Sequence, residues 1–156
     1  ANPDAEVMVQ YANSFTDSAL GKTIANQMHS KNADIIFTCA GAVGIGAIEA
    51  AKENGKKAIG VDQDQNSLAP ENVITSAMKN IDVSVEEMLS KVVDGSYKGG
   101  EIIVNTLAMN GVGIPQSSEK NVPPDVLTYV KEEAEKVKSG EVKVPATKEE
   151  FEQLNK

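Results

Sequence analysis

The feature that most constrains the fold is a pattern in residues 33–79, where three apolar segments each end at a different kind of turn. The first stops at Gly41 in a glycine-rich turn, the second at Asp62 in an acidic turn, and the third at Lys79 in a polar turn. Short apolar runs bounded in this way predict buried strands, and the helix-length stretch after the first predicts a parallel connection. The three segments are residues 34–40, 58–61 and 73–78.

A binding site is expected where these strands end, because ligands bind beyond the carboxyl ends of strands in an open α/β sheet. Phe15 follows another apolar segment, residues 7–12, so right-handed crossovers bring it to the same edge. Gly41 lets a ligand approach the backbone, Asp62 accepts hydrogen bonds from hydroxyl groups, and Lys79 donates them. Plainer interpretations stay open: Phe15 covers the edge of the core, Asp62 caps a turn, and Lys79 pairs with Asp62.

Helical segments alternate with the predicted strands, and most have a recognisable start or stop. Asp17 or Thr16 is expected to cap the first helix and Asp82 a later one, while Gly55 and Gly95 each end a helix. This alternation predicts a three-layer α/β fold, with a mainly parallel sheet between helices on both faces. The strands are predicted at residues 7–12, 33–40, 58–61 and 73–78, and the helices at 17–31, 44–54 and 83–93.

After Gly95 the sequence changes character. Two consecutive prolines begin a charged helix, and Thr147 is expected to cap the last one with Glu150 at the capping-box position. We expect a single lobe over residues 1–156, with residues 108–156 forming a hinge-crossing and terminal helical segment. The elements predicted here are a strand at residues 101–107, a turn or domain crossing at 110–115, and helices at 123–139 and 148–154.

Composition excludes several classes of function. The net charge of −8 argues against binding to nucleic acid or to an anionic membrane surface, both of which need basic patches. No apolar run approaches the ~20 residues that a membrane-spanning helix needs. Aromatic residues make up only 4% of the chain and tryptophan is absent, so an aromatic side chain in a polar turn draws attention.

The sequence offers little support for catalysis or metal binding. Cys39 is the only cysteine and is expected to be a buried thiol in mid-strand; His29 is the only histidine and is expected to be a solvated residue near a helix C-terminus. With a single cysteine and a single histidine, the sequence gives almost no support for a zinc site or for a Cys-His or Ser-His nucleophile. Asp62 and Asp64 lack the ligand spacing of a calcium loop. We therefore predict no enzyme activity, no metal and no cofactor.

Several segments together resemble the basic membrane protein family, the purine-nucleoside-binding lipoproteins of bacterial ABC transporters. They lie in the family's order and spacing, and the resemblance covers nearly the whole chain. The family's fold is that of type I periplasmic binding proteins, which have two α/β lobes joined by a hinge. The resembling segments are residues 10–17, 40–46, 60–65, 75–80, 94–100 and 110–113.

The resemblance implies a role for each residue at the strand ends. Phe15 would pack against a purine face, and Gly41 would bring backbone groups close to the ligand. Asp62 would accept hydrogen bonds from ribose hydroxyls, and Lys79 would donate to the ribose. Asp17, beside the aromatic residue, would support the turn or reach the base. Family members are about twice as long as this chain, which resembles only their carboxyl-terminal half.

These observations predict the substrate-binding component of an ABC importer, present here as a partial chain. A purine nucleoside and the ABC permease are the expected partners, and the isolated lobe offers surfaces for a homodimer. The full-length parent is expected to be extracytoplasmic and lipid-anchored. Two alternatives stay open: the same fold binds a sugar or acts as a ligand-sensing domain, or the chain is a small α/β enzyme.

Overall fold

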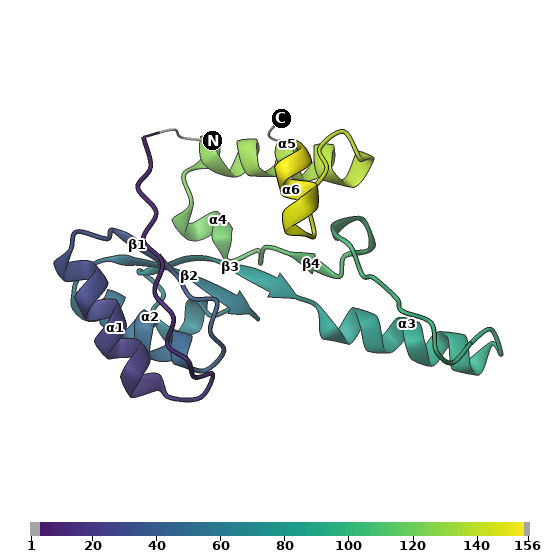
Figure 1. The fold of residues 1–156 in the computed structure, drawn as a ribbon, viewed down its shortest axis with the longest axis horizontal. Coiled ribbons are helices and arrows are strands. Elements are labelled where there is room, and N and C mark those ends of the chain that lie inside the picture. The colour runs from purple at the N-terminus through teal and green to yellow at the C-terminus, as the bar shows by residue number, and fades with distance from the viewer. Residues whose placement is uncertain (1–3, 155–156) are drawn as a thin grey trace. The chain divides into compact units, whose positions relative to one another are not determined.

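The computed structural model describes residues 4–154 and contains a four-stranded sheet in the order β1-β2-β3-β4 (Figure 1). β1 pairs with β2, and β2 pairs with β3, both in parallel. A helix connects β1 to β2, and a short 3-10 turn lies between β2 and β3. The mixed α/β fold with a mainly parallel sheet is confirmed. The strands are β1 (Ile35–Phe37), β2 (Lys57–Asp62), β3 (Val73–Lys79) and β4 (Val112–Gly113).

The helices lie close to their predicted positions. α2 and α6 are each within one residue of the sequence prediction at both ends, and Gly55, Gly95 and Gly140 follow helices with φ between +62° and +80°. A left-handed residue at this position is a common helix stop. The helices are α1 (Ser18–Ser30), α2 (Val43–Glu53), α3 (Ile81–Val93), α4 (Ser118–Asn121), α5 (Pro124–Ser139) and α6 (Lys148–Leu154), with short 3-10 turns η1 (Asn66–Leu68) and η2 (Leu107–Met109).

The chain divides into two compact units. The first consists of the residues up to Asn80 together with residues 113–122, and it holds α1, α2 and strands β1 to β3. The second consists of residues 81–112 and those from Pro123 onward, and it holds α3, α5 and α6. All of the residues predicted to bind ligand belong to the first unit.

α2 forms the centre of the first unit because it contributes to both of its apolar clusters. One cluster joins α2 to the strands β2 and β3, and the other joins α2 to α1 and β1. Burial of these side chains stabilises the unit and fixes the strands whose ends carry the candidate site. The first cluster contains Ile48, Ala51, Ala58, Ala69 and Val73; the second contains Ala25, Ile36, Ala47 and Ala50.

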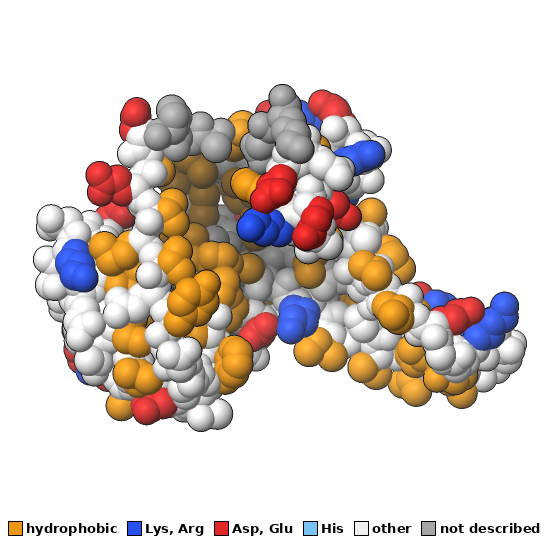
Figure 2. Space-filling view, in the orientation of Figure 1, with side chains coloured by type: hydrophobic (Ala, Val, Ile, Leu, Met, Phe, Trp, Pro, Cys, Tyr) orange, Lys and Arg blue, Asp and Glu red, His pale blue; other side chains and the backbone are white. Residues whose placement is uncertain are grey.

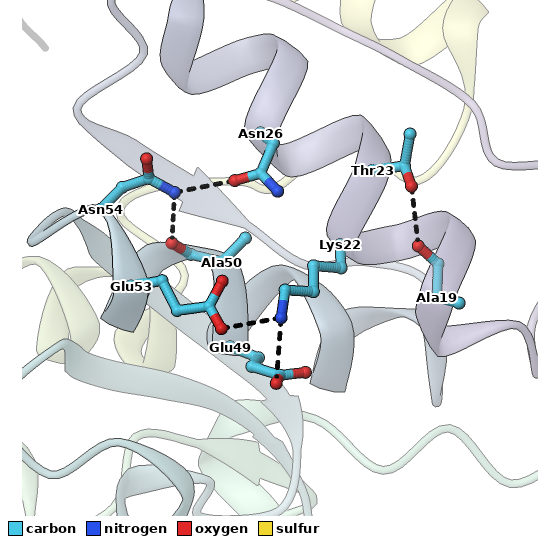
Figure 3. Close-up of polar contacts among 8 residues, drawn as sticks. All are labelled: Ala19, Lys22, Thr23, Asn26, Glu49, Ala50, Glu53 and Asn54. Atoms are coloured by element: carbon cyan, nitrogen blue, oxygen red, sulfur yellow. Dashed lines mark hydrogen bonds and ion pairs between the residues drawn. The ribbon is translucent and has the colours of Figure 1, made fainter.

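Polar contacts also join α1 to α2 (Figure 3). Lys22 Nζ lies 2.8 Å from Glu53 Oε1 and 3.1 Å from Glu49 Oε1, and these hydrogen bonds raise the pKa of the lysine. Asn54 Nδ2 donates to Asn26 Oδ1 at 2.8 Å. Because these side chains lie at the surface, their contacts add little to the stability of the helix pair.

Two predicted strands are not strands in this structure. Residues 7–12 and residues 101–107 carry no β-pairing, and most of their apolar side chains are exposed; Val7 is 84% exposed and Ile102 is 92% exposed. A strand is stabilised by its neighbours in a sheet, so a β-prone segment without a neighbour does not form one. Both predictions were wrong for this chain, although the segments have the right composition.

The environment of His29 also differs from the prediction. His29 is buried rather than solvated, because it lies one turn after the buried Ala25 on the same face of α1. Its Nδ1–H donates to the Ala33 carbonyl oxygen at 2.9 Å, and its Nε2 is buried without a partner among the described residues.

Two predicted helix caps have different outcomes. Asp82 lies inside the first turn of α3 and not before it, so it is not the predicted cap. The cap of α6 is confirmed: the Glu150 N–H donates to Thr147 Oγ1 at 3.2 Å, and Glu150 Oε2 accepts from the Ala146 N–H at 2.6 Å.

Across residues 4–154, no helix combines the length and the apolar character that crossing a membrane requires.

Candidate functional site

Asp62 and Lys79 meet at the carboxyl ends of β2 and β3. Asp62 is the last residue of β2 and pairs in register with Met78, the neighbour of Lys79. Asp62 Oδ1 lies 3.7 Å from Lys79 Nζ, and the two side chains are 56% and 63% exposed. An ion pair this open contributes little to stability, so both groups stay available to a polar ligand.

Phe15 is held against the glycine turn that follows β1. The Ala42 N–H donates to the Phe15 carbonyl oxygen at 2.9 Å, and Gly41 adopts φ +58°. A Cβ added to Gly41 would lie 3.1 Å from that same oxygen, so only glycine suits both the conformation and the approach. The Phe15 side chain is 75% exposed, so this aromatic ring is fixed at its backbone but open to solvent.

Asp17 caps α1. Its Oδ1 accepts from the Leu20 N–H at 2.9 Å, which confirms Asp17 rather than Thr16 as the cap. Ser14 Oγ accepts from the Thr16 and Asp17 N–H groups at 3.2 and 3.1 Å. These bonds order the turn on both sides of Phe15.

The turn after β2 is fixed by Gln65, a residue that the sequence analysis did not single out. Asp62 adopts φ +67°, a left-handed conformation that aspartate tolerates better than most residues. Gln65 Oε1 accepts from the Val61 N–H at 2.9 Å, and the Gln65 N–H donates to Ser76 Oγ at 3.1 Å. Gln65 is buried, so these bonds hold the Asp62 backbone in its unusual conformation. A glutamine in a polar turn gives no sequence signal of this role.

Cys39 was expected to be buried in mid-strand and is instead exposed. The cause is the early end of β1 at Phe37, which leaves Cys39 in the connection to Gly41. Partial burial raises the pKa of the Cys39 thiol, and the negative charge of Asp62 raises it further. The charge that acts on this thiol, which follows β1, is therefore that of Asp62 at the end of β2.

We expect the alkylation rate of Cys39 to report on this proximity. Iodoacetamide reacts with the thiolate, so a raised pKa slows the reaction near pH 8. Asp62→Asn removes one of the two causes, lowers the pKa and speeds alkylation. Asp64→Asn, two residues further along the same turn, is the matched control and should leave the rate unchanged. Equal rates in both variants would contradict the proximity.

The described residues contain no group of three or more His, Cys, Asp or Glu side chains that could hold a metal ion. Asp64, considered with Asp62 in the sequence, uses Oδ1 to accept from the Asn66 N–H at 3.0 Å and so closes its own turn. The arrangement at the strand ends is an aromatic ring, a glycine backbone, a carboxylate and an ammonium. It can stack on a flat ring and hydrogen-bond to hydroxyl groups.

Comparisons with known proteins connect the chain to transport. A family described as "ABC transporter substrate-binding protein PnrA-like" matches residues 1–148. Basic membrane protein B of Borreliella burgdorferi is 38% identical over 156 residues, which cover 97% of this chain and 44% of that protein. The CD4+ T-cell-stimulating antigen of Listeria monocytogenes is 36% identical, with 92% of this chain and 44% of that protein covered. The chain thus spans less than half the length of these relatives.

Solved structures agree with this result. A solute-binding protein of an ABC transporter system from Aeropyrum pernix K1 has a TM-score of 0.77 and 26% identity, covering 89% of this chain and 47% of that chain. Another from Conexibacter woesei has a TM-score of 0.74, with 92% and 48% covered; at 23% identity it shows the fold alone. The predicted fold, one lobe of a type I periplasmic binding protein, is confirmed.

Proposed function

Because this chain belongs to the PnrA-like family of ABC transporter substrate-binding proteins, we propose that it forms one lobe of a receptor that holds a purine nucleoside between two lobes. The observation that carries the proposal is the continuity of suitable groups at one edge of the sheet. Phe15 bonds to the Gly41 turn that follows β1, and Asp62 at the end of β2 pairs with Lys79 at the end of β3. The three strands are parallel neighbours, so their carboxyl ends lie at one edge. A nucleoside needs a stacking surface at one end and hydroxyl partners at the other.

In this proposal each group has one task. The exposed ring of Phe15 stacks on the base, in the position that Asp17 fixes by capping α1. Gly41 lets the ligand reach the backbone. Asp62 accepts hydrogen bonds from the ribose hydroxyls and Lys79 donates to the ribose, so the 3.7 Å ion pair opens around the ligand. No covalent step is required, which agrees with a family of binding components.

Exposed apolar surface in the second unit supports the proposal that this chain is part of a longer protein. α3 has no buried residue, and Val85, Leu89 and Val92 are each more than half exposed. A helix with such a surface normally packs against other polypeptide. Since the chain spans less than half of its relatives, the missing half is the natural source of that polypeptide.

We propose that the complete protein is anchored by lipid at the outer face of the cytoplasmic membrane and delivers its ligand to an ABC permease.

Titration calorimetry tests the proposal. Guanosine, adenosine, inosine and ribose are titrated into this chain and into the complete two-lobe protein. We expect nucleosides to bind the complete protein and to bind this chain weakly, because closure of both lobes supplies much of the contact. A complete protein that binds ribose or another sugar but no nucleoside would favour the sugar-binding alternative. Turnover of any of these compounds would favour the enzyme.

Phe15→Ala separates recognition of the base from recognition of the sugar. In the complete protein, loss of the ring should weaken nucleoside binding by roughly 1–3 kcal/mol, the usual contribution of aromatic stacking on a base. Binding of free ribose should not change. Tyr97→Ala is the control, because it removes an exposed aromatic side chain from the second unit. Equal losses for nucleoside and ribose in Phe15→Ala would show that Phe15 does not touch the base.

A further inference from the structure

β3 contains one residue more than the stretch of β2 with which it pairs. The ladder passes from the pair Ala58–Val73 directly to the pair Ile59–Thr75. Ile74 is therefore left without a partner in β2. An extra residue of this kind is a β-bulge, and it shifts every later pair of the two strands by one residue.

The shift decides how close the two charged groups of the candidate site lie. In the observed register Asp62 lies opposite Met78, and Lys79 is one residue beyond. Without the shift, Asp62 would lie opposite Ala77 and Lys79 would be two residues beyond, about 3.3 Å further along the strand. The distance of 3.7 Å between Asp62 Oδ1 and Lys79 Nζ belongs to the shifted register. Hydrophobic side chains gather on the visible face of the first unit (Figure 2), so a polar ligand there depends on where this charged pair is placed.

The hydrophobic pattern of β3 does not by itself select the shifted register. Thr75, Ser76 and Ala77 are small or polar, so either register would place similar side chains on the two faces of the sheet. Burial holds a strand of this kind only weakly in register. Hydrogen bonds must therefore distinguish the two registers.

On one face of the sheet, Ser76 holds the shifted register. Val73 and Ser76 are both completely buried, and their partners in β2 lie two residues apart, on the same face. An unbroken strand would place residues three apart on opposite faces. The Gln65 N–H donates to Ser76 Oγ at 3.1 Å, and a Cβ added to Gly60 would lie 2.6 Å from that oxygen. The hydroxyl fills the space beside Gly60, where Thr75 would bring an additional methyl group.

On the other face, α4 brackets the unpaired residue. Ser118 Oγ lies 2.8 Å from Oγ1 of Thr75, the residue just after Ile74, and the two hydroxyls share a hydrogen bond. Asn121 Nδ2 donates at 2.8 Å to the carbonyl oxygen of Val73, the residue just before Ile74. The two side chains are three residues apart on one turn of α4, which lies beside β3 (Figure 1). Ser118 is only 1% exposed, so its hydroxyl depends on this partner.

We propose that Ser118 and Asn121 are positioning residues for the ligand, because they hold β3 in the register that brings Lys79 to Asp62. They act through β3 and do not touch the ligand themselves. Residues 113–122, which include α4, belong to the same compact unit as β2 and β3, so the proposal concerns this unit alone. It rests on the proposed function in taking Asp62 and Lys79 as the groups that hold the ligand.

Nuclear magnetic resonance of this chain tests the register without a ligand. Backbone proton contacts between Asp62 and Met78 report the shifted register, and contacts between Asp62 and Ala77 report the unbroken one. When Ser118→Ala and Asn121→Ala are combined, we expect the contacts of the unbroken register to appear beside those of the shifted one. A double variant that keeps the shifted register alone overturns the proposal.

Two further comparisons separate the register from a general loss of stability. Asn72→Ala is the control, because Asn72 Nδ2 donates to the Lys56 carbonyl oxygen at 2.8 Å, at the opposite end of β2, and its loss should leave the register unchanged. Thr75→Val removes the hydrogen bond to Ser118 with little change of volume, so it serves where the double variant does not fold. Thr75→Ser retains the hydroxyl and should keep the shifted register. The same register in Thr75→Val and Thr75→Ser overturns the proposal.

Calorimetry with guanosine then tests the effect on binding in the complete two-lobe protein. The double variant should raise Kd by roughly fivefold or more, the equivalent of one hydrogen bond, and Asn72→Ala should leave Kd unchanged. An altered register with an unchanged Kd would show that Ser118 and Asn121 do not position the ligand. If the unmodified complete protein binds no nucleoside, the proposed function fails, and the register measurement still decides whether α4 places Lys79.

Discussion

Replacing Gly46 with alanine is expected to destabilise the first unit by about 3 kcal/mol, the upper end of the usual cost of overpacking. Gly46 lies in α2 where α1 crosses closest. An added Cβ would overlap the Ser18 carbonyl oxygen and lie 2.8 Å from the Lys22 backbone nitrogen. Both are backbone atoms of α1, so no rotamer change relieves the clash and the helices must separate. The same holds for Gly21 in α1, where an added Cβ would overlap the Val43 carbonyl oxygen of α2.

The substitution has a second effect, the higher helix propensity of alanine, which stabilises α2 and is smaller than the cost of the clash. Alanine favours a helix over glycine by about 1 kcal/mol, so a neutral or stabilising result would mean that α1 and α2 do not pack this closely. Urea unfolding followed by circular dichroism measures the outcome, as a midpoint lower by roughly 1–2 M. Gly99→Ala is the matched control: the same atom added there meets nothing within 4 Å, and the midpoint should not move.

The parts of the fold predicted correctly are those specified by local sequence. α2 and α6 have apolar spacing or capping residues at their own ends, and β2 and β3 lie between clear turns. The ends of β2 and β3 placed Asp62 and Lys79 together, because a parallel sheet brings strand ends to one edge. Asp17 as a cap followed from the same local rules.

The wrong predictions depend on partners distant in sequence. Residues 7–12 have a strand's composition, but no strand of the described residues pairs with them. The burial of His29 and the exposure of Cys39 depend on how α1 packs and where β1 ends, which a single residue does not reveal. Gln65 is the clearest omission: its role appears only when its side chain is seen beneath the β2 turn.

The second large effect is expected at Asp62. In the complete two-lobe protein, Asp62→Ala should weaken nucleoside binding by about 1.5–3 kcal/mol, the usual range for hydrogen bonds to a charged group. This corresponds to roughly a 10- to 150-fold increase in Kd. Alanine also strains the φ of +67° at this position, so Asp62→Asn is the cleaner variant, since asparagine accepts left-handed conformations.

Stability and binding should respond differently to the asparagine variant. The Asp62–Lys79 pair is more than half exposed, so its loss should change the free energy of unfolding by less than about 1 kcal/mol. Nucleoside affinity should fall, because the amide replaces one acceptor oxygen by a donor that faces the ribose hydroxyls. Asp64→Asn should preserve affinity, since Asp64 serves its own turn. If calorimetry gives the same Kd for Asp62→Asn and Asp64→Asn, Asp62 only closes a turn and the ligand lies elsewhere.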